Sequence, residues 1–229
     1  VSTICIMENL GKFLFNTHIN TPSILFGLFT LCVSLLFIKK LSRKEVIILI
    51  IPNVYYFFDI IASCITKYAQ SDENIWFYNW VLLLELLLYF FVFKSLFQSI
   101  KIKRIINIVI VVFTITHVIN ILFGQGSHIF CTFTLIPAHV AAVIFAYLHM
   151  KLTIDDINIV PIKQFSFWFS IASFISISTS IPVLSIINSL NENNQELADK
   201  IFILNDIAYC CWYALIIAGL IWTKKLTKI

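Results

Sequence analysis

The feature that most constrains the fold is one long apolar stretch with a carboxylate near its middle. Residues Ile75–Phe97 (IWFYNWVLLLELLLYFFVFKSLF) are predominantly apolar and carry Glu85 at the centre. About 20 such residues in a helix, rising about 1.5 Å each, match a hydrocarbon core of roughly 30 Å. A carboxylate at that depth costs a few kcal/mol unless it faces protein, water or a partner. The stretch therefore predicts a transmembrane helix that turns Glu85 toward the interior of a bundle.

Composition supports a membrane location for the whole chain. Of 229 residues, 60% are hydrophobic and 12% charged, and the mean hydropathy is +0.94. Soluble domains carry about 25% charged residues. The formal charge of +4 does not indicate a nucleic-acid partner, because the basic residues lie at the ends of the apolar stretches, as membrane topology requires. We predict an all-α integral membrane protein in a lipid bilayer, without room for a soluble catalytic, nucleotide-binding or DNA-binding domain.

Six further apolar stretches predict a seven-helix bundle. We expect a transmembrane domain over residues 23–223, preceded by an N-terminal extracytoplasmic or interfacial segment, residues 1–22, and followed by a basic cytoplasmic tail, residues 224–229. Val1 and Met7 are both candidate first residues. The predicted spans are 23–38, 45–66, 75–97, 105–123, 129–149, 165–189 and 201–223.

The distribution of lysine and arginine predicts the orientation. Most basic residues fall on one side of the predicted membrane, and under the positive-inside rule that side is cytoplasmic. The N-terminus is then outside and the C-terminus inside, in a multi-pass protein of the plasma (inner) membrane. Many Phe, Ile, Leu and Asn residues with few Gly or Ala suggest an AT-rich microbial genome, and we expect a bacterial protein. The residues on the basic side are Lys39, Lys40, Arg43, Lys44, Lys101, Lys103, Arg104, Lys151, Lys163, Lys224, Lys225 and Lys228, against Lys12, Lys67 and Lys200 on the other.

Polar residues inside the predicted spans fall on one side of the membrane. Counting from the span ends places the buried carboxylates and histidines in the outer half. Residues three, four or seven apart share a helix face, which adds tyrosines and an asparagine to this group. We therefore predict an outward-facing polar pocket for a small ligand. Its expected residues are Glu85, Asp59, Asp206, His117, His139, Tyr89, Tyr209 and Asn205.

Each of these residues also has a purely structural interpretation. Glu85 could be hydrogen-bonded to a tyrosine that fixes helix packing, and the two histidines could be hydrogen-bonded packing residues. A run of serines in the sixth predicted span favours close contact between helices over ligand binding. These serines are Ser166, Ser170, Ser173, Ser176 and Ser180.

No cofactor is predicted. A haem or metal at His117 and His139 is disfavoured, because their estimated depths differ and the chain has no HxxxH or HExxH pair. We assign no metal ligand and no catalytic residue. Cys64 and Cys131 both fall near the predicted outer face, where an oxidising compartment would permit a disulfide.

Seven spans with an outside N-terminus is also the layout of rhodopsins and G-protein-coupled receptors. In the last span, however, Asp206 is followed four residues later by Cys210, and no lysine precedes Lys224. A retinal Schiff base is therefore not supported, and the receptor hallmark motifs are absent as well. We assign no family, since a shared architecture does not predict function.

Four functions are consistent with these residues. We expect first a receptor- or sensor-like protein that binds a small ligand in the outward pocket and signals through a separate membrane or cytoplasmic protein. The alternatives are an accessory or anchoring subunit of a larger membrane complex, a proton- or cation-coupled transporter using Glu85, and an intramembrane hydrolase using the histidines.

Overall fold

The computed structural model describes residues 21–68 and 75–226, and this part of the chain is 89% helical and contains no strand. The predicted all-α class is confirmed. Its α-helices are α2 (Thr21–Phe37), α3 (Arg43–Tyr68), α4 (Ile75–Leu96), α5 (Ile100–Phe123), α6 (Thr132–Asp155), α7 (Phe165–Asn193) and α8 (Gln195–Leu226), with short 3₁₀ helices η1 (Ile38–Lys40) and η2 (Pro161–Lys163).

Within the described ranges, six helices are long and apolar enough to cross a bilayer. They correspond to α3 through α8, so the chain has the helices of a multi-pass membrane protein. The remaining long helix, α2, has 17 residues, at the short end of the length that spans a hydrocarbon core. A seventh span at α2 and the orientation of the termini therefore stay predictions.

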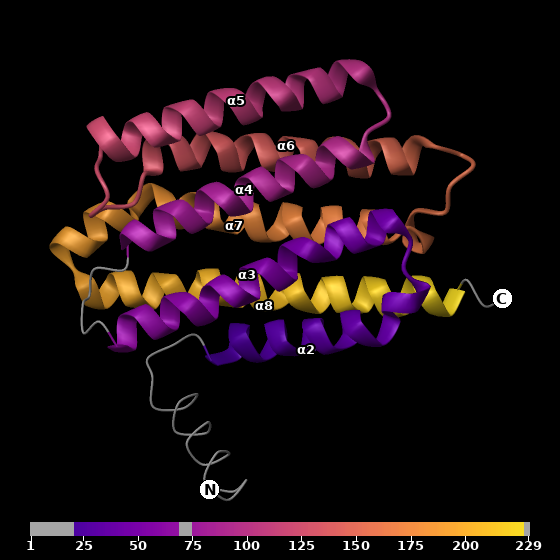
Figure 1. Ribbon diagram of the computed structural model, residues 1–229, viewed down its shortest axis with the longest axis horizontal. Helices are drawn as coiled ribbons and strands as arrows, with labels where there is room; N and C mark the ends of the chain where they lie inside the picture. Colours follow the sequence, from indigo (N-terminus) through magenta and orange to yellow (C-terminus); the bar gives the residue numbers. More distant parts are fainter. Residues whose placement is uncertain (1–20, 69–74, 227–229) are drawn as a thin grey trace, which may run out of the picture.

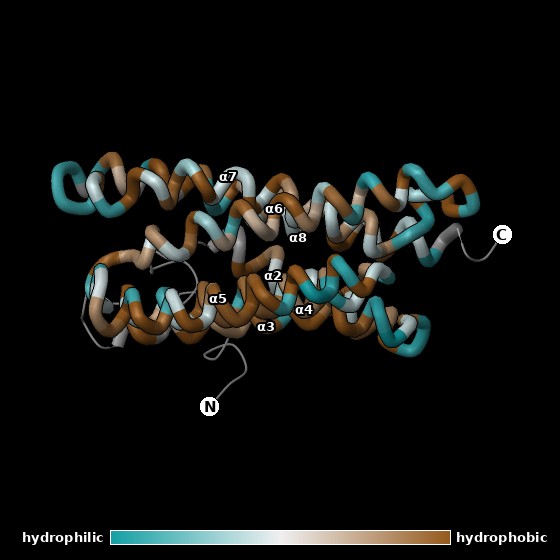
Figure 2. Tube along the Cα trace, turned by 90° about the horizontal axis from the view of Figure 1, so that it is seen from above, coloured by the Kyte–Doolittle hydropathy of each residue, from teal (hydrophilic) through white to brown (hydrophobic). Residues whose placement is uncertain are grey.

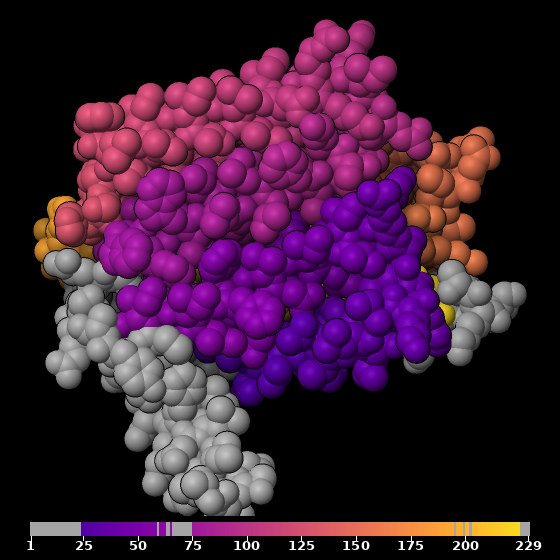
Figure 3. Space-filling view, in the orientation of Figure 1, coloured from indigo at the N-terminus to yellow at the C-terminus, as the bar shows by residue number. Residues whose placement is uncertain are grey.

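The helices pack in two layers with their axes along the length of the molecule (Figure 1). Viewed from above, α3, α4 and α5 form one layer and α6, α7 and α8 the other, while α2 packs against α3 and α8 (Figure 2). The space-filling view shows α2, α3, α4 and α5 side by side on one face (Figure 3). α4 also contacts α6 across the layers, so its side chains reach the centre of the bundle.

Between its two ends, the bundle exposes many large apolar side chains. The outer side of α5 exposes a row of branched aliphatic side chains, among them Ile108, Val111 and Ile115. In water such a face would be a large exposed apolar patch, whereas lipid solvates it. Inside, large aromatic and aliphatic side chains are fully buried between the layers, including Phe90 and Phe169.

The two ends of the bundle are hydrophilic and the middle is apolar (Figure 2). At one end α3, α5 and α7 begin and α8 finishes, and this end carries the basic residues 39–44, 101–104 and 224; we call it the basic end (Figure 1). At the opposite end the connection 124–131 joins α5 to α6. The helix starts and stops thus place the charges where a membrane interface would solvate them.

Local sequence signals fix helix ends at both sides. At the start of α3 the sequence Ser42-Arg43-Lys44-Glu45 forms a capping box: the Ser42 amide donates to Glu45 Oε2 at 2.7 Å, and the Glu45 amide donates to Ser42 Oγ at 3.4 Å. At the opposite end, Gly126 follows α5 with φ of 82°, a left-handed conformation that glycine adopts without steric cost.

A second glycine sets the distance between α7 and α8. A Cβ atom at Gly219 would collide with the side chain of Trp168, which lies directly across the helix interface. The Trp168 indole in turn donates to the Ile162 carbonyl at 3.0 Å and so ties this contact to the connection before α7. Close approach of α7 and α8 therefore depends on the missing side chain at position 219.

We predict that Gly219→Val lowers the free energy of unfolding by about 1–3 kcal/mol, the usual range for overpacking a close contact. Thermal unfolding of the purified protein in detergent measures the change. Ala218→Val, on the exposed side of the same turn, is the matched control and should leave the midpoint nearly unchanged. Equal effects of both substitutions would contradict the packing role of Gly219.

Candidate functional site

Glu85 lies in an aromatic cluster at the centre of the bundle. Its side chain is 7% exposed, and the Tyr209 hydroxyl from α8 donates to Glu85 Oε1 at 3.5 Å. Tyr55 from α3 stacks on Tyr209 with ring centroids 4.8 Å apart. Tyr89, one turn along α4 from Glu85, is 1% exposed and packs against Trp212 of α8 at 6.2 Å. Three of the predicted ligand-binding residues, Glu85, Tyr89 and Tyr209, therefore lie together.

Several polar atoms in this cluster are buried without a hydrogen bond of good geometry. The hydroxyls of Tyr89 and Ser173 and the indole nitrogen of Trp212 are fully buried and have no hydrogen-bond partner among the described residues. Ser173 comes from α7 and lies close to the Tyr89 hydroxyl, near hydrogen-bond reach, and Glu85 lies close enough to that hydroxyl to act on it electrostatically. We call Tyr55, Glu85, Tyr89, Ser173, Tyr209, Trp212 and Tyr213 the Glu85 cluster.

His117 lies toward the end of the bundle opposite the basic end, in a separate hydrogen-bonded network. Its ring is 0% exposed, with Nδ1 2.8 Å from Thr134 Oγ1 and Nε2 3.1 Å from the Asn79 carbonyl oxygen. The Asn79 side chain donates to the Ile129 carbonyl and accepts from the Cys131 amide. These bonds attach the α5–α6 connection to α4, which is a structural role for His117.

His139 on α6 and Asn205 on α8 have hydrogen-bond partners outside the Glu85 residue and its tyrosines. His139 is 4% exposed, and its Nδ1 lies 2.8 Å from the Leu135 carbonyl oxygen of its own helix. Asn205 accepts a hydrogen bond from the Ser180 hydroxyl at 2.8 Å, and the neighbouring Asp206 is partly buried. In the described part of the structure no hydrogen bond joins either His117 or His139 to Glu85.

Two predicted residues have side chains outside the described part of the structure. Asp59 and Cys64 lie on α3, and nothing about their side chains enters the site. The Cys131 thiol is 0% exposed and contacts the Gly126 carbonyl oxygen at 3.6 Å. A disulfide between Cys64 and Cys131 therefore stays a prediction. No three His, Cys, Asp or Glu side chains among the described residues are placed to hold a metal ion.

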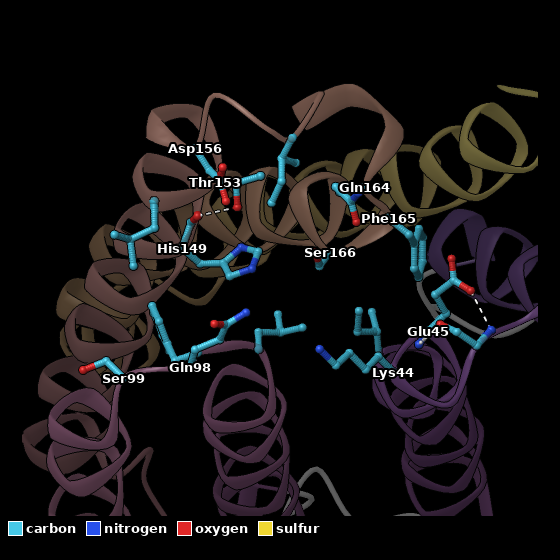
Figure 4. A pocket seen from close by; sticks show the side chains of 16 residues that line it. Lys44, Glu45, Gln98, Ser99, His149, Thr153, Asp156, Gln164, Phe165 and Ser166 are labelled. Carbon is cyan, nitrogen blue, oxygen red and sulfur yellow. Dashed lines mark hydrogen bonds between the residues drawn. The ribbon is translucent and has the colours of Figure 1, made fainter. Parts of the chain in front are cut away.

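The structure contains a cavity at the basic end that the sequence did not predict. Its volume is about 470 Å³, and its walls come from α3, the α4–α5 connection, α6, the segment before α7, and the start of α7 itself. Figure 4 shows the Lys44 side chain, the Gln98 amide and the His149 ring pointing into this space from different elements. We call it the basic-end cavity; its lining residues are Ser42, Lys44, Glu45, Ile48, Leu96, Phe97, Gln98, Ser99, His149, Leu152, Thr153, Asp156, Ile159, Gln164, Phe165 and Ser166.

The charges around this cavity are unevenly compensated. Glu45 is paired with Lys224 of α8 at 2.7 Å, with side chains only 16% and 12% exposed. Asp156 accepts hydrogen bonds from the backbone and side-chain amides of Asn158. Lys44 has no ion-pair partner in the part of the chain that the structure describes. Among the described residues, the cavity therefore presents one positive charge, Lys44, and one negative charge, Asp156, that have no ion-pair partner.

His149 supplies a second polar group to the cavity. It is 8% exposed, its Nδ1 lies 2.9 Å from the Ser170 hydroxyl, and its ring packs edge-on against Phe97. Nε2 has no hydrogen-bond partner among the described residues, so it is left for water or a ligand, as donor or acceptor according to its tautomer. Two helices that begin here, α5 and α7, have no side-chain cap, and their amide groups add positive potential.

Sequence reasoning missed this cavity because its residues belong to different span ends. In the sequence, Lys44 is one of the basic residues that predict topology, and His149 is the last residue of the predicted span 129–149. The S-x-x-E pattern at Ser42–Glu45 was the available signal, since it predicts an ordered helix start at this end. The pairing of Glu45 with Lys224, 179 residues apart, had no local signal.

The fold and the site define a class: a multi-pass helical membrane protein with a buried carboxylate at its centre and a polar cavity at one end. The chain matches no protein-family model, no curated protein and no solved structure.

We predict that Tyr209→Phe destabilises the protein by about 1–3 kcal/mol, because it removes the hydroxyl that donates to the buried Glu85 carboxylate. In the Glu85→Gln background the same substitution should cost less, since a neutral amide needs that donor less. Unfolding midpoints of the four proteins in a double-mutant cycle measure the coupling. Tyr147→Phe, at an exposed position on α6, is the control. Additive effects would contradict a Tyr209–Glu85 interaction.

We also predict that Cys131 reacts slowly with maleimide at neutral pH. Burial raises the pKa of its thiol to about 11, so the reactive thiolate is scarce until the pH approaches that value. Mass spectrometry after alkylation should show Cys131 unmodified in the folded protein and modified after denaturation. Modification of denatured Cys131 only after addition of a reductant would instead indicate the Cys64–Cys131 disulfide.

Proposed function

We propose that this chain is a small-ligand-binding membrane protein of the receptor or sensor type, and that the basic-end cavity is its binding site. The observation that supports the proposal is a cavity of about 470 Å³ with polar groups from several elements, a size typical of small-molecule sites. The proposal keeps the predicted class but moves the site from the outward pocket to the basic end. The outward pocket around Glu85, Asp59, Asp206 and His117 is the second candidate site.

The ligand we propose is a small molecule with a carboxylate or phosphate group. Lys44 offers a positive charge without an ion-pair partner among the described residues, and the Gln98 amide and His149 ring offer hydrogen bonds. The Glu45 carboxylate, which would repel an anion, is neutralised by Lys224, whereas the Asp156 carboxylate is hydrogen-bonded to Asn158 and keeps its charge. The anionic group of the ligand is therefore proposed to bind beside Lys44 and away from Asp156. Ligand groups of this chemistry form charge-assisted hydrogen bonds with lysine.

We propose further that the basic end faces the cytoplasm of a bacterial plasma membrane and that α2 is a seventh span. The ligand is then a cytoplasmic anion or the headgroup of an inner-leaflet lipid, which share this chemistry. We propose that a separate membrane or cytoplasmic partner transmits the signal. A ligand in the cavity would contact α3, α6 and α7, which all contribute to its walls, and would thereby change how these helices pack.

The test is binding of anionic probes to the full chain in nanodiscs of neutral lipid. Inorganic phosphate, glycerol phosphate, glutamate and citrate are titrated while the unfolding midpoint is recorded, and a second series adds anionic lipid to the nanodiscs. We expect at least one probe to raise the midpoint. A shift only with anionic lipid would identify a headgroup as the ligand, and one with soluble probes a free anion.

We predict that Lys44→Gln weakens binding of the active probe roughly tenfold, the loss of about 1.4 kcal/mol expected for one charge-assisted contact. Lys101→Gln is the matched control, because Lys101 is an exposed lysine at the same end that does not line the cavity. Equal weakening by both substitutions would indicate general attraction to a basic surface. No shift with any probe would contradict the proposal and favour the accessory-subunit alternative.

A further inference from the structure

The Glu85 cluster contains buried donors that point to a bound polar molecule. The side chains of Tyr89, Ser173 and Trp212 are 1%, 0% and 1% exposed, and each has a polar atom without a hydrogen-bond partner among the described residues. Buried polar groups in proteins are nearly always hydrogen-bonded, to protein or to internal water. The Tyr89 and Ser173 hydroxyls lie close to each other, and the Trp212 indole has neither of them as a partner. Buried donors and acceptors of this kind beside one carboxylate exceed what packing alone accounts for.

These donors come from three helices and converge near Glu85. Tyr89 follows Glu85 on α4, Ser173 comes from α7 and Trp212 from α8. The described titratable groups of the cluster are Glu85 itself and Tyr55, Tyr89, Tyr209 and Tyr213, none of which carries a positive charge. An internal water needs two to four polar partners, and the cluster supplies that number.

One face of α7 connects this cluster to the basic-end cavity. Ser166, Ser170 and Ser173 are spaced four and three residues apart and therefore share a helix face. Ser166 lines the cavity, and the Ser170 hydroxyl lies 2.9 Å from His149 Nδ1. His149 reaches the cavity with the other side of its ring (Figure 4). A polar path therefore leads from the cavity toward the centre of the bundle.

We infer that Glu85 exchanges its proton with the basic-end cavity along His149, Ser170, Ser173 and Tyr89, with water bound among the buried donors. This activity is separate from the proposed ligand binding and does not depend on it.

The transfer needs only N–H and O–H bonds to form and break. A cavity water gives a proton to His149 Nε2 and takes one in turn from an acid of the surrounding buffer, while Nδ1 gives its proton to the Ser170 hydroxyl. The Ser170 hydroxyl, which donates to the Ser166 carbonyl at 3.0 Å, rotates and passes its own proton to water near Ser173. That water and the Tyr89 hydroxyl each accept one proton and release one, and the Glu85 carboxylate takes the last. The net result is one proton moved from the cavity to Glu85.

Infrared spectroscopy of the full chain in lipid bilayers tests the route. A protonated carboxylic acid gives a carbonyl band in the infrared spectrum. The band that is lost in the Glu85→Gln variant belongs to Glu85. We expect this band to appear as the buffer pH is lowered and to shift promptly when H₂O is replaced by D₂O. Ser173→Ala and Ser170→Ala should each slow the shift by roughly tenfold or more, since each removes a group that relays the proton.

Two serines of the same helix are matched controls. Ser180 bonds to Asn205 toward the opposite end, and Ser185 is exposed and bonds to the Ile181 carbonyl. In the Ser180→Ala and Ser185→Ala variants, the Glu85 band should shift in D₂O at the wild-type rate. A Glu85 band that never appears, or one that does not exchange, would overturn the inference. Wild-type exchange in both Ser170→Ala and Ser173→Ala would overturn the route, as would slow exchange in Ser180→Ala alone.

Discussion

A carboxylate at the centre of an apolar bundle must find its partners within the protein, because hydrocarbon offers none. Glu85 meets this constraint through aromatic side chains from the helices around it: the Tyr209 hydroxyl donates to it, and Tyr55 stacks on Tyr209. The need to surround one charge explains why α3, α4, α7 and α8 meet at tyrosine, tryptophan and serine instead of leucine. The same side chains therefore pack these helices against one another and solvate Glu85.

The two ends of the bundle are built from different chemistry. At the end opposite the basic residues, neutral amides and hydroxyls close the α5–α6 connection: Asn188, for example, holds both the amide and the carbonyl of Phe130. Such paired groups leave little for a ligand to bind. At the basic end an ion pair, Glu45 with Lys224, borders a cavity into which Lys44 projects. The hydrogen bonds of the α5–α6 connection therefore serve the structure, whereas Lys44 has a charge that is available to bind a ligand.

Much of the fold, and part of the Glu85 cluster, could be predicted from residues near one another in the sequence. Apolar length predicted the helices, and the spacing of Glu85 and Tyr89 predicted that they share a face of α4. What could not be predicted was which helices become neighbours. The His117 partners and the cavity walls depend on side chains that meet only after the bundle has formed, and no local pattern encodes such contacts. The pairing of Lys224 with Glu45 is the clearest case, since each alone is typical of a span end.

The cavity and the Glu85 cluster share α7, and this has a consequence for both proposals. His149 is the only side chain we assign to both the ligand site and the proton route. A ligand that hydrogen-bonds His149 Nε2 occupies the atom through which a cavity proton would enter. Binding and protonation of Glu85 are then coupled, and thermodynamic linkage makes the coupling reciprocal: if the ligand changes the proton affinity of Glu85, the protonation of Glu85 must change the affinity for the ligand by the same factor. A receptor of this construction would report on its ligand and on proton availability together.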